Sequence, residues 1–301
     1  MHKHPSLGVA LVLLAALLWG TTGTAQALAS GALPAVWFGA LRLLVAALFF
    51  AVWARLDRTP VASVCPPLAP VLAAGLCMAA YNLAFFAGVR LTGVALGTAV
   101  ALGSGPVWAG LLQALWTRRW PVPVWWLGTA VAVAGGVSMS LSAGAAGGLR
   151  ADPLGLGLCL LSGLSWGCYS LLNAELLRHL PAGRVTLWAF GLAAVLALPL
   201  AWWDSGWPVL QLGDVMAVLY VGLLTAGVAY LLFSHALRHI SAATGVTLAL
   251  AEPVVAFVLA VLVLGEQPGA RTLPGLLLVL AGVGLVVRAE LRSARRARAH
   301  F

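Results

Sequence analysis

Two charged residues lie inside long apolar stretches of the chain. Arg42 is about eight residues into the stretch 34–56, and Glu252 is near the middle of the stretch 241–264. Inside a membrane such charges are costly and usually functional. A guanidinium can bind a carboxylate through two parallel hydrogen bonds, and a buried carboxyl group can carry a coupling proton. At 1.5 Å per residue the two depths differ by roughly 6 to 8 Å, so the residues can also pair and brace the bundle.

A proline directly follows Glu252. Pro253 lacks a backbone N–H and clashes with the carbonyl four residues earlier. We therefore expect a bend here and a free Ala249 carbonyl beside the carboxylate. Pro106 occupies the equivalent place in an earlier stretch but follows Gly105 rather than an acid. The two stretches share a predicted bend, and only one of them carries a charge.

Aromatic and amide side chains are the best candidates for a cavity wall. Three share one face of the stretch 68–90, a tyrosine in 213–237 is their approximate counterpart, and two tryptophans lie deep in other stretches. Ordinary aromatic packing is the alternative for each ring. The predicted binding residues are Trp19, Arg42, Tyr81, Asn82, Phe85, Trp166, Tyr169 and Tyr230, with Glu252 as the predicted coupling residue.

Composition shows what must position these residues. The chain is 62% hydrophobic and 8% charged with a mean hydropathy of +1.02, which excludes an ordinary soluble domain. A bilayer core about 30 Å thick needs roughly 20 apolar residues per helix. Ten stretches qualify, at about 7–29, 34–56, 68–90, 94–117, 122–142, 154–177, 184–203, 213–237, 241–264 and 271–288. The predicted fold class is an all-α membrane protein.

The chain also contains an internal duplication. Six residues recur in order 147 positions later, since Trp19, Gly20, Pro106, Pro121, Gly128 and Gly135 match Trp166, Gly167, Pro253, Pro268, Gly275 and Gly282. We expect one repeat over 1–146 and a second over 147–301. Five spans per repeat is an odd number, so the second copy enters the membrane from the opposite side. Two inverted repeats around a central cavity are typical of alternating-access transporters.

Charge placement predicts the orientation. With the N-terminus inside, 13 of the 17 Lys and Arg residues lie on the cytoplasmic side, and only Arg90, Arg150 and Arg271 lie outside. Cationic loops stay cytoplasmic, so both termini are expected there, in a prokaryotic inner membrane. The same rule accounts for the net charge of +9 without a nucleic-acid partner. The four cysteines show no metal spacing, so we expect no metal, disulfide or cofactor.

Small residues recur every fourth position in two stretches. They are Gly93, Gly97, Ala101 and Gly105 in one, and Ser241, Gly245 and Ala249 in the other. Such faces let helices approach closely. We expect these two helices to meet near the pseudo-twofold axis.

Together these residues resemble the drug/metabolite transporter superfamily, EamA type. The resemblance runs from about Gly8 to Val287 and rests on Trp19-Gly20, Trp166-Gly167, Arg42, the run Tyr81-Asn82-Leu83-Ala84-Phe85, and Ala251-Glu252-Pro253. It implies a basket of eight helices around the cavity, with the spans 122–142 and 271–288 peripheral and open to a homodimer contact. It also implies export of amino acids, metabolites or drugs.

The leading hypothesis is a secondary exporter of amino acids or related metabolites, with proton coupling through Glu252 as an addition. A sugar or organic-anion carrier is the alternative within transport. An intramembrane enzyme is disfavoured, because Leu102 stands where a Gly-x-Ser-Gly motif needs glycine, one acid alone is central and HExxH is absent. A passive channel is disfavoured because the sequence has no charge ring or filter repeat.

Overall fold

The computed structural model describes residues 4–29, 31, 33–57, 68–143, 152–265 and 272–299, and within them every regular element is helical. Ten helical spans are long and apolar enough to cross a membrane, which confirms the predicted class. The predicted boundary between residues 146 and 147 lies outside the described residues. The elements are α1 Pro5–Ala27, α2 Ala35–Leu56, α3 Leu68–Thr92, α4 Val94–Thr117, α5 Pro123–Ala143, α6 Pro153–Leu176, α7 Ala182–Ser205, α8 Leu212–Tyr220, η1 Val221–Val228, α9 Ala229–Ala236, α10 Ala242–Leu248, η2 Ala249–Ala251, α11 Glu252–Leu262 and α12 Thr272–Ala299.

Corresponding helices of the two repeats begin in similar ways. Both α1 and α6 have a proline in the first turn, where the missing N–H has no helical partner to lose. Asp152 caps α6 by accepting a hydrogen bond from the Gly155 N–H at 2.8 Å. The first turn of each entry helix is thus fixed by a proline, and that of α6 also by a side-chain cap.

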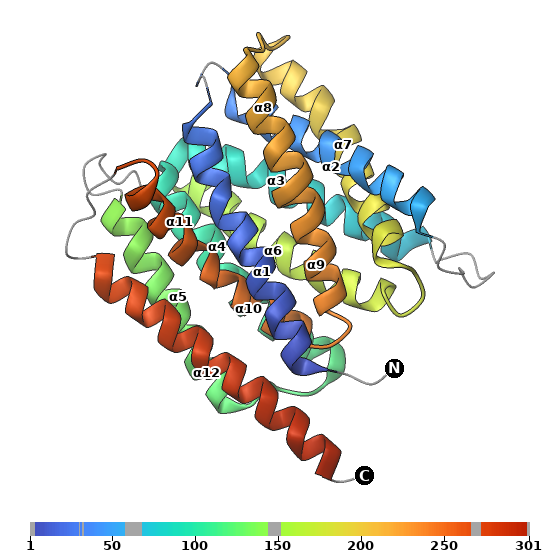
Figure 1. The fold of residues 1–301 in the computed structure, drawn as a ribbon, viewed down its shortest axis with the longest axis vertical. Helices are drawn as coiled ribbons and strands as arrows, with labels where there is room; N and C mark the ends of the chain where they lie inside the picture. Colours follow the sequence, from blue (N-terminus) through green and yellow to red (C-terminus); the bar gives the residue numbers. More distant parts are fainter. Residues whose placement is uncertain are drawn as a thin grey trace.

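The two chain ends lie on the same side of the molecule (Figure 1). We call the side where α1 begins and α12 ends the terminal side, and the opposite side the far side. The loop between α9 and α10 is on the terminal side, where the His4 N–H donates to His239 Nδ1 at 3.3 Å. At the far side, Arg90 at the end of α3 forms an ion pair of 2.8 Å with Asp204 at the end of α7.

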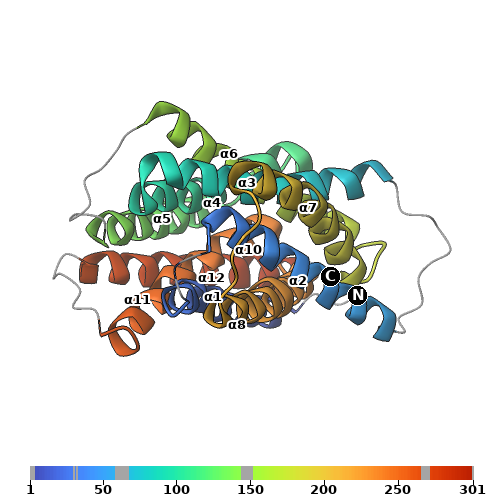
Figure 2. The same cartoon turned by 90° about the horizontal axis from the view of Figure 1, so that it is seen from above.

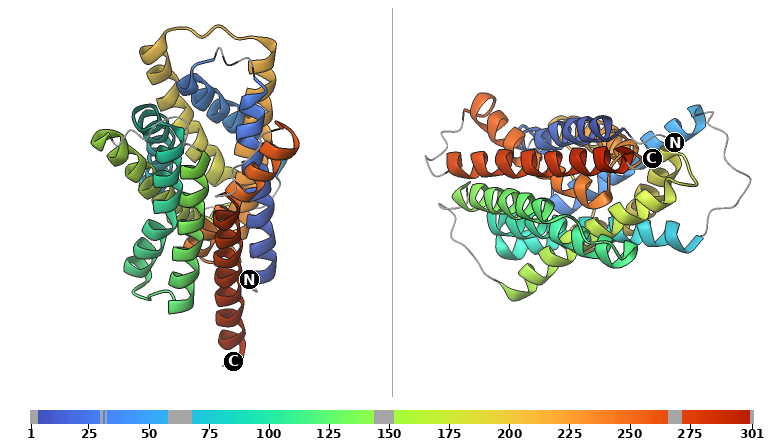
Figure 3. Two further views of the ribbon diagram at one scale, coloured as in Figure 1. Left: turned by 90° about the vertical axis from the view of Figure 1, so that its left-hand side faces the viewer. Right: turned by 90° about the horizontal axis from the view of Figure 1, so that it is seen from below.

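The helices form two layers, and each layer mixes both repeats. One layer contains α3 to α7, and the other contains α1, α2, α8 to α11 and α12 (Figure 2). The view from below shows the same division (Figure 3). Under the duplication the first layer maps onto the second, as expected for inverted repeats.

The peripheral helices α5 and α12 pack directly on each other across the layers. A methyl group on Gly128 would lie 2.9 Å from the Gly282 carbonyl oxygen, and one on Gly135 would lie 2.6 Å from that of Gly275. Since Gly128 corresponds to Gly275 and Gly135 to Gly282, the contact is self-complementary, as a twofold axis requires. The glycine faces of α5 and α12 therefore form a contact within one chain.

The eighth and ninth spans are irregular near their middles. In the eighth span η1 is a π-helix of eight residues, a form that is usually short and often found at functional sites. In the ninth span the 3₁₀ segment η2 precedes Pro253, and the Glu252 N–H donates to the Ala249 carbonyl. The expectation of a free Ala249 carbonyl was therefore wrong. The equivalent Pro106 lies within the uninterrupted helix α4.

The small residues of α4 approach α6 more closely than they approach the ninth span. A methyl group on Gly163 of α6 would lie 2.7 Å from the Ala101 carbonyl oxygen and 3.1 Å from the Gly105 nitrogen. α4 does touch α10, where Gly105 faces Val246, but its closest backbone approach is to α6. The expectation that the fourth and ninth spans meet was correct, but Gly245 of the ninth span faces Leu237 and Phe233 instead of α4.

Candidate functional site

The two repeat-related tryptophans meet where the layers join. Trp19 of α1 and Trp166 of α6 have ring centroids 6.1 Å apart. Each also contacts the tyrosine of the other repeat, since Trp19 lies 5.2 Å from Tyr230 and Trp166 lies 6.2 Å from Tyr81. Four predicted binding residues thus form one ring cluster on the pseudo-twofold axis.

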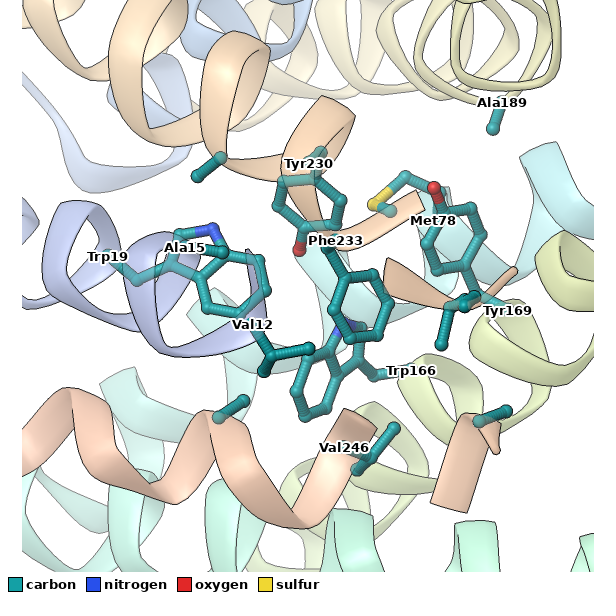
Figure 4. Packing of buried hydrophobic residues seen from close by; sticks show 14 of the residues in the cluster. Val12, Ala15, Trp19, Met78, Trp166, Tyr169, Ala189, Tyr230, Phe233 and Val246 are labelled. Carbon is teal, nitrogen blue, oxygen red and sulfur yellow. The ribbon is translucent and has the colours of Figure 1, made fainter. Parts of the chain in front are cut away.

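On the terminal side of this cluster the space is filled. Phe233 of α9 is 0% exposed and has its ring centroid 5.6 Å from that of Trp19 and 6.1 Å from that of Trp166. Figure 4 shows these rings converging above Val12 and Val246. We call Trp166, Tyr169, Tyr230 and Phe233 the aromatic seal.

Tyr169 lies in the seal and is fully buried. Its hydroxyl accepts a hydrogen bond from Asn173 Nδ2 at 3.4 Å, and the same amide nitrogen donates to Ser234 Oγ at 3.0 Å. The Asn173 amide nitrogen thus links α6 to α9, while its Oδ1 has no hydrogen-bond partner among the described residues. Tyr169 therefore belongs to closed packing in this state rather than to an exposed cavity wall.

Burial changes sharply along the ninth span. All seven residues of α10 are buried, whereas none of the eleven residues of α11 is. Since α10 begins on the terminal side, the ninth span is buried there and less buried toward the far side. Tyr81, Phe85, Arg42 and Glu252 are all partly exposed.

The charged residues come near each other without pairing. Within the described residues no ion pair of 4.0 Å or less joins Arg42 to Glu252, although both interact electrostatically with Tyr81. The Arg42 guanidinium carbon lies 5.9 Å from the centroid of the Phe86 ring, a cation–π contact. The direct salt bridge that the sequence allowed is not formed in this state.

Three buried donors of the site have no hydrogen-bond acceptor. They are Arg42 Nε, Asn82 Nδ2 and Trp166 Nε1. Asn82 lies against α2, because a methyl group on Gly39 would be 2.9 Å from its Oδ1. Phe85 follows Tyr81 along α3 with ring centroids 6.5 Å apart. Unsatisfied buried donors are rare and call for an explanation.

Phe233, Phe86 and Thr225 were not among the predicted site residues. Phe233 is three residues after Tyr230 and Phe86 is four after Asn82, so helical spacing could have indicated both. Thr225 contributes its backbone carbonyl, which accepts a hydrogen bond from Trp19 Nε1 at 2.9 Å. No side-chain pattern could have shown this contact, because it depends on the π-helix. In the described part of the chain no three His, Cys, Asp or Glu residues come together as metal ligands.

Ten spans in two inverted repeats, with unpaired charges and aromatic rings at their shared axis, define a multi-pass membrane transporter. The EamA-like transporter family matches residues 6–141 and again residues 153–288. The chain belongs to this family, and hence to the drug/metabolite transporter superfamily.

Similar proteins cover between 68% and 96% of the chain. The "Uncharacterized transporter YwfM" of Bacillus subtilis is 36% identical over 291 residues and covers 96% of both chains. A "Probable terminal-alkyne amino-acid exporter" of Streptantibioticus cattleyicolor is 27% identical over 206 residues, which is 68% of each. A solved crystal structure has a TM-score of 0.79 at 19% identity, covering 94% of this chain and 98% of its own, and shows the shared fold.

Proposed function

We propose that this transporter exports amino acids or closely related zwitterionic metabolites by alternating access. Arg42 binds the carboxylate of the solute, and Glu252 faces its ammonium group and carries the coupling proton. The aromatic rings around them contact the apolar part of the solute. The membrane is the prokaryotic inner membrane, with both termini in the cytoplasm.

The observation that carries this proposal is the separation of the two charges. Arg42 and Glu252 lie on two helices of the same layer, α2 and α11, are partly exposed, and form no ion pair with each other. A zwitterion supplies one opposite charge to each of them. The orphan donors Arg42 Nε and Asn82 Nδ2 favour an acceptor-rich group such as a carboxylate at the Arg42 end.

Export and amino-acid cargo have one further support. The relative from Streptantibioticus cattleyicolor, which is 27% identical to this chain over 206 residues, is described as a probable terminal-alkyne amino-acid exporter. Among the described residues Arg42 is the one cation far from the ends of a span, which suits a solute with one carboxylate better than a solute with several negative charges.

The test is ligand-induced stabilisation of the purified protein, because a ligand that binds only the folded state raises its stability. The probes are phenylalanine, phenylalaninamide, which lacks the carboxylate, and N-acetylphenylalanine, which lacks the ammonium group. We expect phenylalanine to raise the melting temperature and both analogues to have little effect. Arg42→Gln should weaken phenylalanine binding by about 10- to 100-fold, since hydrogen bonds to charged groups contribute ~1.5–3 kcal/mol.

Leucine and glycine in the same panel show how much the aromatic wall contributes. Stabilisation by sugars or organic dianions, with none from any amino acid, would contradict the proposal and support the alternative carrier. Counterflow in liposomes with the best amino acid then checks that binding leads to transport.

A further inference from the structure

A cavity of about 210 Å³ lies on the terminal side, away from the central site. It is formed by the end of α4, the loop after it, the start of α5, the start of α10 and the last third of α12. The side chains that matter for its chemistry are Gln113, Trp120, Trp125, Ser241, Thr244 and Glu290. None of the residues that line it belongs to the aromatic seal or to the predicted binding residues. The proposed solute site therefore does not account for this cavity.

Glu290 of α12 supplies the carboxylate of the cavity and is held in place by α10. Thr244 Oγ1 donates to Glu290 Oε2 at 2.7 Å, and Ser241 Oγ donates to Thr244 Oγ1 at 2.9 Å. Glu290 is the one acid among the residues that line the cavity. A carboxylate has about four acceptor sites, so Glu290 can accept from an ammonium group in addition to its partners within the chain.

Two tryptophans add aromatic surface to the same cavity. Arg118 ends α4 in the left-handed conformation with a φ of 53°, and after this turn Trp120 lies against Trp126 of α5 with ring centroids 6.4 Å apart. Trp125 is 4% exposed, and its Nε1 has no acceptor in the described part of the chain. Aromatic faces attract cations, and a buried donor without a partner calls for an acceptor.

The cavity lies at the depth of phospholipid headgroups. At 1.5 Å per residue Glu290 is about 27 Å along α12 from Thr272, close to the bilayer core thickness of about 30 Å. The exposed side chains at this end of α4 and on this part of α12 are basic, and they are Arg118, Arg119, Arg288 and Arg292. Arginines bind phosphate groups, whereas Glu290 and the tryptophan rings favour a positive group. A zwitterionic headgroup satisfies both.

We propose that this cavity binds the headgroup of a phospholipid that carries a primary ammonium group, namely phosphatidylethanolamine. The ammonium group contacts Glu290 and the ring of Trp120, and the phosphate faces the arginines at the rim. The bound lipid thus bridges α4, α5, α10 and α12 at the terminal side and stabilises their packing. This inference depends neither on the identity of the solute nor on the coupling proton.

The test is thermal unfolding of the delipidated protein in detergent, titrated with phosphatidylethanolamine or with phosphatidylglycerol, which has no ammonium group. A ligand that binds only the folded state raises its stability. We expect phosphatidylethanolamine to raise the melting temperature by about 2–4 °C more than phosphatidylglycerol does. Glu290→Gln should weaken the apparent affinity for phosphatidylethanolamine about tenfold, because a charge-assisted hydrogen bond is lost, and should leave the response to phosphatidylglycerol unchanged.

Two matched controls are available in the chain. Glu175 also lies toward the terminal side, in an ion pair of 3.2 Å with Arg178, and it does not line the cavity, so Glu175→Gln should respond to lipid as wild type does. Trp116 and Trp120 are both 67% exposed, and of the two only Trp120 lines the cavity. We expect Trp120→Ala to weaken the apparent affinity for phosphatidylethanolamine about two- to fivefold and Trp116→Ala to leave it unchanged.

Equal stabilisation of the wild-type protein by the two lipids would overturn the proposal, and so would equal losses of affinity within either pair of variants. If Glu290→Gln does not fold, the comparison of Trp120→Ala with Trp116→Ala decides. Free ethanolamine at the same concentration should have little effect. Stabilisation by ethanolamine as strong as that by the lipid would overturn the lipid assignment, because the cavity would then hold a soluble amine.

Discussion

At the residue scale, Arg42 and Glu252 carry opposite charges and lie near each other without forming a salt bridge. Arg42 has an unpartnered Nε and an aromatic neighbour in Phe86, while Glu252 begins α11 directly before Pro253. A direct salt bridge between Arg42 and Glu252 would compete with the charged groups of the solute for the same two side chains. The open arrangement leaves both groups free to change partners during a transport cycle.

The first prediction concerns Glu252. Glu252→Gln keeps the shape of the side chain and one oxygen acceptor, replaces the other oxygen by an amide donor, and removes the titration. We expect transport driven by a pH gradient to fall to the level of empty liposomes, with the melting temperature within a few degrees of wild type. Wild-type protein in the same lipid is the control. Full pH-driven transport by the variant would remove Glu252 from the coupling role.

The second prediction concerns His239 at the terminal side. Burial, and then the neighbouring His4, Arg238 and His235, lower the pKa of His239, and its Nδ1 accepts the His4 N–H. Because the unfolded chain binds a proton more readily, the folded state loses stability as the pH falls below about 6.5. The loss ends below the lowered pKa of the folded state.

His239→Gln retains an acceptor and cannot titrate in this range. We expect the melting temperature of the variant to fall less than that of wild type between pH 7 and pH 5, and to match it above pH 7. Thermal unfolding across this range is the measurement. Parallel curves for the two proteins would show that His239 does not contribute to the pH dependence.

At the element scale, the sequence predicted every span and missed how two of them are built. Apolar length and paired prolines suffice for the spans, because a bilayer imposes one helix length on any sequence. The π-helix at Val221–Val228 was not predictable, since its residues are as suited to an α-helix as their neighbours. Its form is tied to a contact 206 residues away in sequence, the Trp19 bond to Thr225. Likewise α4 and α10 both have faces of small residues, and only the packed structure shows that the backbone of α6 approaches α4 most closely.

The third prediction compares the two repeat-related tryptophans. Trp19→Phe removes a buried hydrogen bond to η1, whereas Trp166→Phe removes an N–H that has no acceptor. Both substitutions delete the same atoms from similarly buried rings. We expect Trp19→Phe to cost about 1 kcal/mol more stability than Trp166→Phe. Thermal unfolding of both variants measures this, and equal losses would mean that the bond to Thr225 adds no net stability.

At the scale of the whole molecule, the repeats are exchanged between layers rather than stacked side by side. Each layer takes two spans from one repeat and three from the other (Figure 2), so a relative movement of the layers alters both ends of the central site together. The seal lies where the layers join, and α5 and α12 join them at the periphery. We expect this peripheral contact to remain in place when the centre opens.

The fourth prediction tests that contact with two adjacent glycines of α5. A methyl group on Gly135 would lie 2.6 Å from the Gly275 carbonyl oxygen and from the Val279 nitrogen, whereas one on Gly136 would meet nothing within 4 Å. Alanine is favoured over glycine in a helix by up to ~1 kcal/mol, so Gly136→Ala should be neutral or stabilising. Gly135→Ala should destabilise by about 1–3 kcal/mol, because the backbones of α5 and α12 must separate. Thermal unfolding of the two variants gives the comparison. Changes of the same sign would mean that the close approach of these helices does not hold the layers together.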